Sequence, residues 1–349
     1  MQIWTSVFAA LAAFALTWLA GFWFIPLLHR LKYGQTILDI GPKWHKAKKE
    51  GTPTMGGVTF IFAVFVSFIV GMIVFSAAGE ADYSNSIDRA ELIRSAAGMI
   101  MAVMLGFMGF LDDFIKVKKK HNEGLTPLQK IIFQVMIIAA YFATLYISGL
   151  RGTVILFPGG LQWDLGLFYY PIMGVGVLYI VNAVNLTDGI DGLCSSVTVI
   201  YMAVFAVIAG MRGMFGQRLM SLCSAGGCIG FLMWNFPPAK VFMGDTGSMF
   251  LGGIVCALGV GCNAEFLMVL AAMVYILEAL SVVIQSTVFK ITKRIYHTKE
   301  GKRLFKMTPI HHHFELSHWS EIKIDAVFSA VAAFFGAFAV ILAYGMFVK

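Results

Sequence analysis

Apolar stretches of about 20 residues recur along the whole chain, and each is long enough to cross the hydrocarbon core of a bilayer as a helix. Charged residues make up only 13% of the sequence, whereas a soluble globular domain carries about 25%. The pattern therefore predicts an all-α polytopic membrane protein, a single domain over 1–349 with about ten transmembrane helices. The predicted spans are 4–28, 55–78, 94–111, 128–149, 167–184, 192–211, 218–236, 247–262, 265–289 and 325–347. The eighth span is the shortest, and a tight turn is expected after it, from Gly261 to Ala264.

The cysteines are odd in number and show no spacing typical of a metal site or a redox motif. They lie within or at the ends of the apolar spans: Cys194, Cys223, Cys228, Cys256 and Cys262. We therefore expect them to be small buried apolar side chains.

Basic residues are distributed unequally between the two sets of connections. The connections after the odd-numbered spans, together with Lys130 just inside the fourth span, hold 20 of the 26 Lys and Arg residues. Because cytoplasmic loops carry the excess of positive charge, these connections are predicted to be cytoplasmic and both termini to lie outside. The net charge of +7 is then explained by topology and by attraction to anionic membrane lipid, with no nucleic-acid partner expected.

An acidic pair ends the third predicted span on this cytoplasmic side. Asp112 and Asp113 are followed by a basic run of Lys116, Lys118, Lys119 and Lys120. Adjacent carboxylates repel each other, so they favour a bound cation, and the lysines suit a polyphosphate. The alternative is a solvated helix end whose lysines only anchor the protein to lipid headgroups.

The end of the fifth span is unusually polar. Asn182 and Asn185 share one helical face, Asp188 and Asp191 are spaced in the same way in the next turn, and two glycines allow close approach of backbone to a ligand. Amides and carboxylates at this density suit ribose, a base edge and a metal. The two Asp-Gly pairs alone are also typical of a turn, but a turn does not require asparagines inside an apolar span.

Pro237 and Pro238 end the seventh span, and Gly-Asp-Thr-Gly-Ser at 244–248 opens the eighth. Backbone amides at a helix start bind phosphate, and Asp245 is a candidate Mg²⁺ ligand, since magnesium typically takes one or two carboxylates together with phosphate oxygens. The alternative role of Asp245 or Thr246 is to cap the eighth span.

Two further segments on the predicted cytoplasmic side suit phosphate. Lys48 to Gly57 combines lysines, hydroxyls and a glycine pair at a helix start, although a plain loop and cap is an equal alternative. Residues 308–315 contain His311, His312 and His313, and three consecutive histidines cannot all face one metal ion. One or two of these imidazoles can instead hydrogen-bond or charge-pair with phosphate.

Glu278 and Gln285 fall on one face of the ninth span. Gln285 is near the cytoplasmic end, where it can contact a base. Glu278 lies deeper, and we assign it no part in the mechanism from sequence.

Taken together, five of these motifs resemble the phospho-N-acetylmuramoyl-pentapeptide transferase family, within the polyprenyl-phosphate sugar-phosphate transferases. The motifs are Gly-Thr-Pro-Thr-Met-Gly-Gly at 51–57, Phe-Leu-Asp-Asp-Phe-Ile-Lys-Val at 110–117, Asn-Leu-Thr-Asp-Gly-Ile-Asp-Gly-Leu at 185–193, Phe-Met-Gly-Asp-Thr-Gly-Ser at 242–248 and Thr-Pro-Ile-His-His-His-Phe-Glu at 308–315. The resemblance extends from the first span to the last, with no departure at the motif positions.

The resemblance implies transfer of phospho-MurNAc-pentapeptide from UDP-MurNAc-pentapeptide to undecaprenyl phosphate with Mg²⁺, which gives lipid I and UMP. It also implies a homodimer in the bacterial inner membrane with a cytoplasmic active site. By motif position the resemblance assigns catalytic roles to Asp112, Asp113, Asp245 and His311, with Asp245 also the magnesium ligand and His311 near phosphate. It assigns the nucleoside pocket to Asn185, Asp188, Asp191, Phe242 and Gln285. The phosphate side is assigned to Lys49, Thr54, Lys116 and Lys120, and His312 is assigned to substrate binding.

Three alternatives follow from the sequence. The preferred mechanism is direct attack by the lipid phosphate with help from Asp112, and a covalent phospho-aspartate route stays open. The nearest other enzyme is a transferase that uses UDP-N-acetylglucosamine. An ion-coupled transporter would also place carboxylates at broken helices, but the sequence has no internal repeat.

Overall fold

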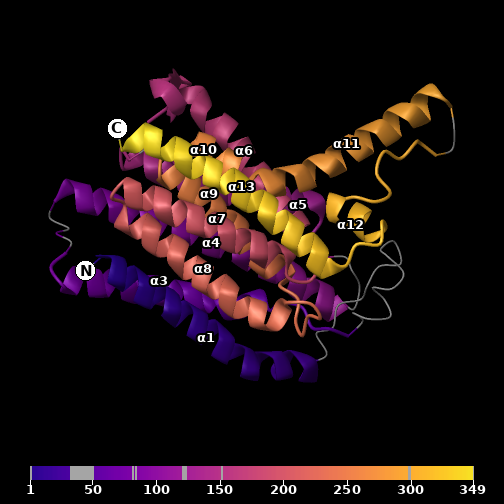
Figure 1. Cartoon of the computed structure of the whole chain (residues 1–349), viewed down its shortest axis with the longest axis horizontal. Helices are drawn as coiled ribbons and strands as arrows, with labels where there is room; N and C mark the ends of the chain where they lie inside the picture. Colours follow the sequence, from indigo (N-terminus) through magenta and orange to yellow (C-terminus); the bar gives the residue numbers. More distant parts are fainter. Residues whose placement is uncertain are drawn as a thin grey trace.

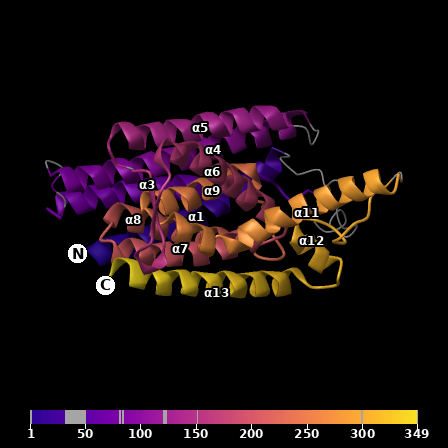
Figure 2. The same cartoon turned by 90° about the horizontal axis from the view of Figure 1, so that it is seen from above.

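The computed structural model describes residues 2–31, 51–80, 82, 85–119, 124–150, 152–297 and 300–348. Lys49 and Lys120, two of the predicted phosphate ligands, lie outside these described residues. The chain forms a bundle of long helices that run side by side (Figures 1 and 2). This confirms the prediction of an all-α polytopic membrane protein.

Nine helices in the described part of the chain are long and apolar enough to cross a membrane. They are α1 (Gln2–Arg30), α3 (Gly57–Ala77), α4 (Ser86–Lys119), α5 (Pro127–Ile147), α6 (Tyr169–Thr187), α7 (Leu193–Met211), α9 (Gly244–Gly261), α11 (Met273–Ile295) and α13 (Glu321–Phe347). Short elements complete the fold: the helices α10 (Glu265–Ala271), α12 (Ile310–Glu315), η1 (Pro158–Gly160) and η2 (Gly166–Phe168), and the antiparallel strands β1 (Val154–Leu156) and β2 (Gln162–Asp164). The strands form a hairpin between α5 and α6.

The predicted span 218–236 corresponds to α8 (Phe215–Asn235), which has the length of a membrane helix but is not among the nine, because no stretch of it is apolar enough. Its small residues allow a close approach to α1: a Cβ atom at Gly226 would lie 2.1 Å from the carbonyl oxygen of Ala10. Figure 1 shows α8 running along the bundle beside the other long helices, with both chain ends at the same end of the bundle. Among the described residues we therefore count α8 with the nine as a tenth long helix of the bundle.

The predicted span 265–289 is not one continuous helix. It breaks at Ala272 between α10 and α11, and the expected tight turn before it contains Asn263 with φ 46°. Beyond the break, the first turns of α11 stay packed against α6, where the Tyr179 hydroxyl donates to the carbonyl oxygen of Ile276, and its last turns project from the bundle (Figures 1 and 2).

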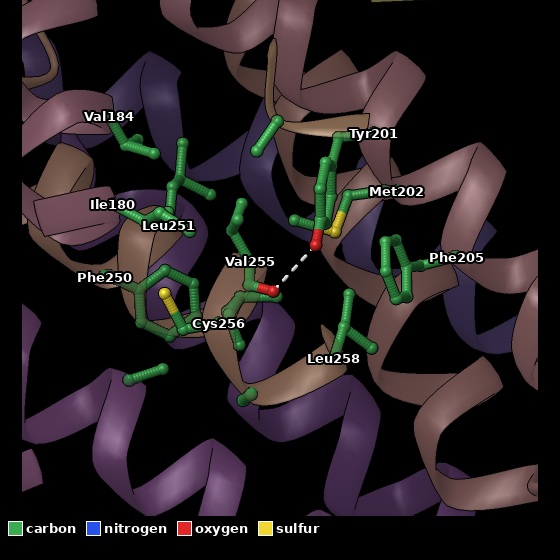
Figure 3. Packing of buried hydrophobic residues seen from close by; sticks show 14 of the residues in the cluster. Ile180, Val184, Tyr201, Met202, Phe205, Phe250, Leu251, Val255, Cys256 and Leu258 are labelled. Atoms are coloured by element: carbon green, nitrogen blue, oxygen red, sulfur yellow. Dashed lines mark hydrogen bonds between the residues drawn. The ribbon is translucent and has the colours of Figure 1, made fainter. Parts of the chain in front are cut away.

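The core of the protein is centred on α9. Every residue of this helix from Thr246 to Gly261 is buried. Figure 3 shows α9 packed against α6 and α7, where the Tyr201 hydroxyl donates a hydrogen bond to the carbonyl oxygen of Val255 (2.9 Å). The five cysteines are buried and unpaired with one another, as predicted. Because α9 is enclosed along its length, its first turn has a fixed position at the end of the bundle opposite the chain termini.

Candidate functional site

Three aspartates meet where the end of α4 contacts the first turn of α9. One carboxylate oxygen from each of Asp112, Asp113 and Asp245 lies within 4.8 Å of the others. The two helices approach closely because Gly109 has no side chain: a Cβ atom there would lie 2.1 Å from the carbonyl oxygen of Asp245. We call these three residues the acidic cluster.

Asp113 holds the start of α9. Its Oδ2 accepts hydrogen bonds from the Thr246 backbone N–H (2.9 Å) and hydroxyl (2.7 Å), and its Oδ1 accepts one from the Asp245 backbone N–H (3.2 Å). These amides belong to the first turn of a helix, where no intrahelical acceptor is available. Asp113 is thus a cap supplied by another helix, and it fixes Asp245 in place.

Two lysines bridge the other two carboxylates. Lys116 Nζ lies 2.6 Å from Asp112 Oδ2 and 3.1 Å from Asp245 Oδ2, and Lys130 Nζ lies 2.8 Å and 2.9 Å from the same two oxygens. Three carboxylates and two ammonium groups leave one formal negative charge, and a divalent cation would reverse it. Hard oxygen ligands held this close together suit Mg²⁺, so the donor set fits the metal that the sequence predicts.

Asn185 brings the end of α6 to the acidic cluster. Its Nδ2 donates to Asp245 Oδ1 (2.9 Å) and to Ser248 Oγ (2.8 Å). Asn182, one turn earlier, instead pairs with Gln134 of α5 (2.9 Å) and lies outside the cluster. The two asparagines therefore have different roles despite sharing a helical face.

The segment before α3 also reaches the acidic cluster. Gly56 N–H donates to the carbonyl oxygen of Phe242, and Phe242 N–H donates to that of Pro53. Thr54 is buried beside the start of α9: a Cβ atom at Gly244 would lie 2.8 Å from Thr54 Oγ1 and 2.5 Å from Asp113 Oδ2. The structure thus brings Thr54 and the ring of Phe242, which is half-buried, to the same end of the bundle.

Asp188 and Asp191 lie in the connection between α6 and α7. Asp188 is the half-buried residue that ends α6. Asp191 is buried, and its Oδ2 accepts a hydrogen bond from the Ala239 backbone N–H (2.9 Å). We call residues 185–192, the end of α6 with the residues that lead to α7, the 185–192 connection. The Asp191 carboxylate joins it to the segment before α9.

The three histidines of α12 have three different partners. His311 Nδ1 lies 3.1 Å from Glu278 Oε2, His312 Nδ1 lies 2.6 Å from Glu315 Oε2, and His313 Nδ1 accepts a hydrogen bond from the Lys306 backbone N–H. His311 is fully buried. The rings therefore do not converge on one point.

Gln285 is already engaged by the connection between α11 and α12. Its Oε1 accepts hydrogen bonds from the backbone N–H groups of Leu304 (2.9 Å) and Phe305 (3.0 Å), and its Nε2 donates to the carbonyl oxygen of Phe305 (3.1 Å). The amide that we expected to contact a base is used here to hold this connection against α11.

Of the predicted site residues, Asp112, Asp113, Lys116, Asn185 and Asp245 are joined directly by hydrogen bonds or ion pairs. The structure adds Lys130, Thr246 and Ser248 to this group, and Glu278 as the partner of His311. The sequence held one signal for Lys130, a charged residue in the first turn of an apolar helix. Nothing in the sequence pattern indicated its partners.

Two open apolar grooves flank α5 on the surface of the bundle. One has a volume of about 650 Å³ and lies between α4 and α5, and the other has a volume of about 670 Å³ and lies between α5 and α6. The first extends to Leu111 and Phe133, within one helical turn of Asp112 and Lys130. Apolar surface therefore continues from the lipid-facing side to the charged end of the bundle.

These features define a polytopic membrane transferase, and residues 95–263 match the model of glycosyl transferase family 4. Residues 49–61 match signature 1 of the phospho-N-acetylmuramoyl-pentapeptide-transferases. Proteins of that name from Clostridium perfringens (strain SM101) and Pelotomaculum thermopropionicum are each 42% identical to this chain, over 94% and 96% of both sequences respectively. The one from Listeria monocytogenes serotype 4b is 39% identical over 94% of this chain and 95% of its own length. The chain belongs to the phospho-N-acetylmuramoyl-pentapeptide-transferase family, enzymes of peptidoglycan synthesis.

Proposed function

We propose that the protein transfers phospho-MurNAc-pentapeptide from UDP-MurNAc-pentapeptide to undecaprenyl phosphate, forming lipid I and UMP. The observation that carries this proposal is the acidic cluster with its two lysines at one end of a membrane bundle. A water-soluble nucleotide donor and a lipid phosphate acceptor can both reach such a position. Family membership supports UDP-MurNAc-pentapeptide as the donor in preference to UDP-N-acetylglucosamine. It also supports an enzyme in preference to an ion-coupled transporter.

We assign a Mg²⁺ ion to Asp245, beside Asp112 and Asp113. Exposure supports Asp245 as the ligand, because an ion that also binds the donor must be reachable from solvent. The Asp245 side chain is 19% exposed, whereas that of Asp112 is fully buried. Asp113 is occupied by the start of α9. When bound, Mg²⁺ would offset the charge of the donor pyrophosphate, the usual role of this ion in phosphoryl transfer.

The residues of the site support a single displacement. An oxygen of the acceptor phosphate attacks the phosphorus that bears the sugar, the bond from that phosphorus to the oxygen of UMP breaks, and UMP leaves as a phosphate monoester. Two phosphate groups repel each other as they approach, and Lys116 and Lys130 lower this cost. Asp112 holds both ammonium groups on one oxygen and accepts a hydrogen bond from Leu125 N–H on the other (2.7 Å). Because both of its oxygens are engaged, this supports Asp112 as the group that orients the acceptor through the two lysines, in preference to a nucleophile.

We assign the uridine to the surface between the 185–192 connection and Phe242, with Asn185, Asp188, Asp191 and Gln285 around it and Phe242 stacking on the base. Gln285 can contribute only if its bonds to residues 304–305 are exchanged for bonds to the ligand. Phosphate contacts are assigned to Thr54, Lys49, Lys120, His311 and His312.

The distribution of basic residues supports a cytoplasmic site in the bacterial inner membrane, with both termini on the other side. We also propose a homodimer, on the basis of the family resemblance. Crosslinking in native membranes tests this assembly separately from the activity.

The experiment that tests the function uses the full chain in detergent with undecaprenyl phosphate and radiolabelled donor. From UDP-MurNAc-pentapeptide we expect labelled lipid and an equal amount of UMP. From UDP-N-acetylglucosamine we expect less than about 1% of that rate of lipid formation. This donor lacks the lactyl-pentapeptide, and a site built to hydrogen-bond a substrate group rejects analogues without it by several orders of magnitude. Labelled lipid from UDP-N-acetylglucosamine at an equal or higher rate would contradict the assignment of the donor. Absence of lipid product from both donors would contradict the proposed reaction.

A further inference from the structure

Glu278 is a fully buried carboxylate in the second turn of α11, a helix long and apolar enough to cross the membrane. An ionisable group at this depth is costly unless it has a partner, and in membrane proteins such a group is a candidate for function. Its Oε2 lies 3.1 Å from His311 Nδ1 and 3.5 Å from the His311 backbone nitrogen. The two contacts attach the first turn of α12 to α11.

The contacts indicate which groups donate. The backbone N–H of His311 can only donate, so Glu278 Oε2 acts as an acceptor. We assign the ring hydrogen of His311 to Nδ1, so that the same carboxylate oxygen accepts both hydrogen bonds. A carboxylate that bonds one ring nitrogen fixes the orientation of the ring and the chemical character of the other nitrogen.

The other ring nitrogen faces the 185–192 connection. A Cβ atom at Gly189 would lie 2.2 Å from His311 Nε2, so the ring edge rests against the backbone of this glycine. His311 Nε2 is buried and has no hydrogen-bond partner among the described residues. Gly189 itself is exposed, and it is flanked by Asp188 and followed by Asp191. The free nitrogen therefore points toward the segment that we assign to the nucleotide.

The same connection leads to the acidic cluster. Asn185, four residues before Gly189, donates hydrogen bonds to Asp245 and Ser248. His311 thus lies between Glu278 and the 185–192 connection, with Nδ1 bonded to the carboxylate and Nε2 against the backbone of Gly189. No polar contact joins Glu278 directly to the acidic cluster in the described residues.

We propose that Glu278 is a positioning residue for the transfer reaction, which holds the His311 ring so that Nε2 is presented to the phosphate or ribose of the nucleotide donor. This inference rests on the proposed function. Glu278 contacts no substrate, and its whole effect passes through His311. It follows that the two residues behave as one unit in mutants.

The test compares Glu278→Leu, which removes the acceptor while keeping the volume, with Glu278→Gln, which keeps an acceptor oxygen. We expect Glu278→Leu to lower kcat by about 10–100-fold, the usual effect of losing a carboxylate that orients a functional histidine. Glu278→Gln should recover part of the loss. The KM for UDP-MurNAc-pentapeptide should rise by less than kcat falls, because a contact that strengthens in the transition state acts mainly on kcat.

A double mutant tests whether the effect passes through His311. In a His311→Ala background, Glu278→Leu should lower the rate by less than about twofold, since residues that act as a unit are not additive. The rates are read with excess enzyme and radiolabelled donor, so that slow variants stay measurable. The matched control is Glu265→Leu, which removes another buried carboxylate, bonded to Tyr169 (2.7 Å), from the far end of the bundle.

Several results would overturn the inference while the wild-type protein still makes lipid product. They are a Glu278→Leu rate within twofold of wild type, a rise in donor KM as large as the fall in kcat, an undiminished effect in the His311→Ala background, and an equal loss of kcat in the Glu265→Leu control. If the wild-type protein makes no lipid product, the proposed function itself fails.

Discussion

Thr246 donates two hydrogen bonds to one oxygen of Asp113, from its backbone N–H at 2.9 Å and from its hydroxyl at 2.7 Å, although the residues are 133 positions apart. The pair joins the end of α4 to the start of α9. It also separates the roles of two adjacent aspartates, because Asp113 faces the helix start while Asp112 faces the lysines.

Replacing Thr246 by Val should weaken this junction without removing the backbone hydrogen bond. We expect a stability loss of about 1–3 kcal/mol for a buried acceptor that loses a donor, and a severalfold lower transfer rate because Asp245 is less firmly placed. The melting temperature and the transfer rate check this. In the control Thr144→Val, an exposed hydroxyl that bonds only Ala140 of its own helix is lost, and both quantities should be unchanged.

Lys130→Gln should leave Asp112 and Asp245 with a single lysine. Because two carboxylates then face one ammonium group, we expect at least about a hundredfold lower kcat, the usual loss when an electrostatic group is removed from a reacting site. The exposed Lys118 provides the control, and Lys118→Gln should be close to wild type. Equal rates for the two variants in the radiolabel assay would show that Lys130 only anchors the helix.

The general architecture was predictable because the cost of exposing polar backbone to lipid leaves few solutions. The apolar stretches located the helices, and their polar ends located Asp112, Asn185 and Asp245. The break at Ala272 was not predictable, since the residues around it, 266–277, are all apolar and include no proline or glycine. The place of α8 in the bundle was not predictable either, because it is set by the close contact of Gly226 with α1, and hydropathy carries no information on which helices are in contact.

The different roles of Asp112, Asp113 and Lys130 within the site could not be predicted from the sequence. Which of two adjacent carboxylates caps α9 depends on how α4 is rotated against it, and this rotation is set by the close contact at Gly109. Lys130 was recognised from sequence only as part of the charge bias. Its ammonium group reaches Asp245 across 115 positions of sequence, a relationship that only the packed bundle creates.

Asp245→Asn should abolish the response of the enzyme to magnesium. The amide keeps the hydrogen-bonding shape but loses the charge that a hard divalent cation requires. We expect a kcat at least about a hundredfold lower at any magnesium concentration. A magnesium titration of the transfer rate checks this, and a variant with the native rate and the native magnesium dependence would remove the metal assignment.

Gln285→Ala should release the connection between α11 and α12. Three hydrogen bonds between this side chain and the backbone of residues 304–305 are lost, so local opening should become easier. Trypsin cleavage after Arg303 in detergent should be several times faster than in wild type. In the control Ser286→Ala, a hydroxyl that bonds only its own helix is lost and cleavage should be unchanged. Unchanged cleavage in both, together with a raised donor KM for Gln285→Ala, would favour a purely ligand-binding role.

Gly109→Ala should separate α4 from α9 at the acidic cluster. The added Cβ atom would lie 2.1 Å from the carbonyl oxygen of Asp245 and 2.4 Å from its carbonyl carbon, and neither backbone can yield without moving a helix. We expect a stability loss of roughly 1–3 kcal/mol, as for overpacking of a core, and a transfer rate at least about tenfold lower, because a small misplacement of reacting groups has large effects on rate.

The matched control for Gly109 is Gly174 in α6, which has nothing within 4 Å of the position of an added Cβ atom. Since alanine is a better helix former than glycine, Gly174→Ala should be neutral or slightly stabilising. Melting temperature and transfer rate, measured on both variants, separate a local effect at the cluster from a general effect of substituting glycine in a membrane helix. Native rate and stability in Gly109→Ala would show that the close approach of α4 to α9 at this glycine does not set the position of Asp245.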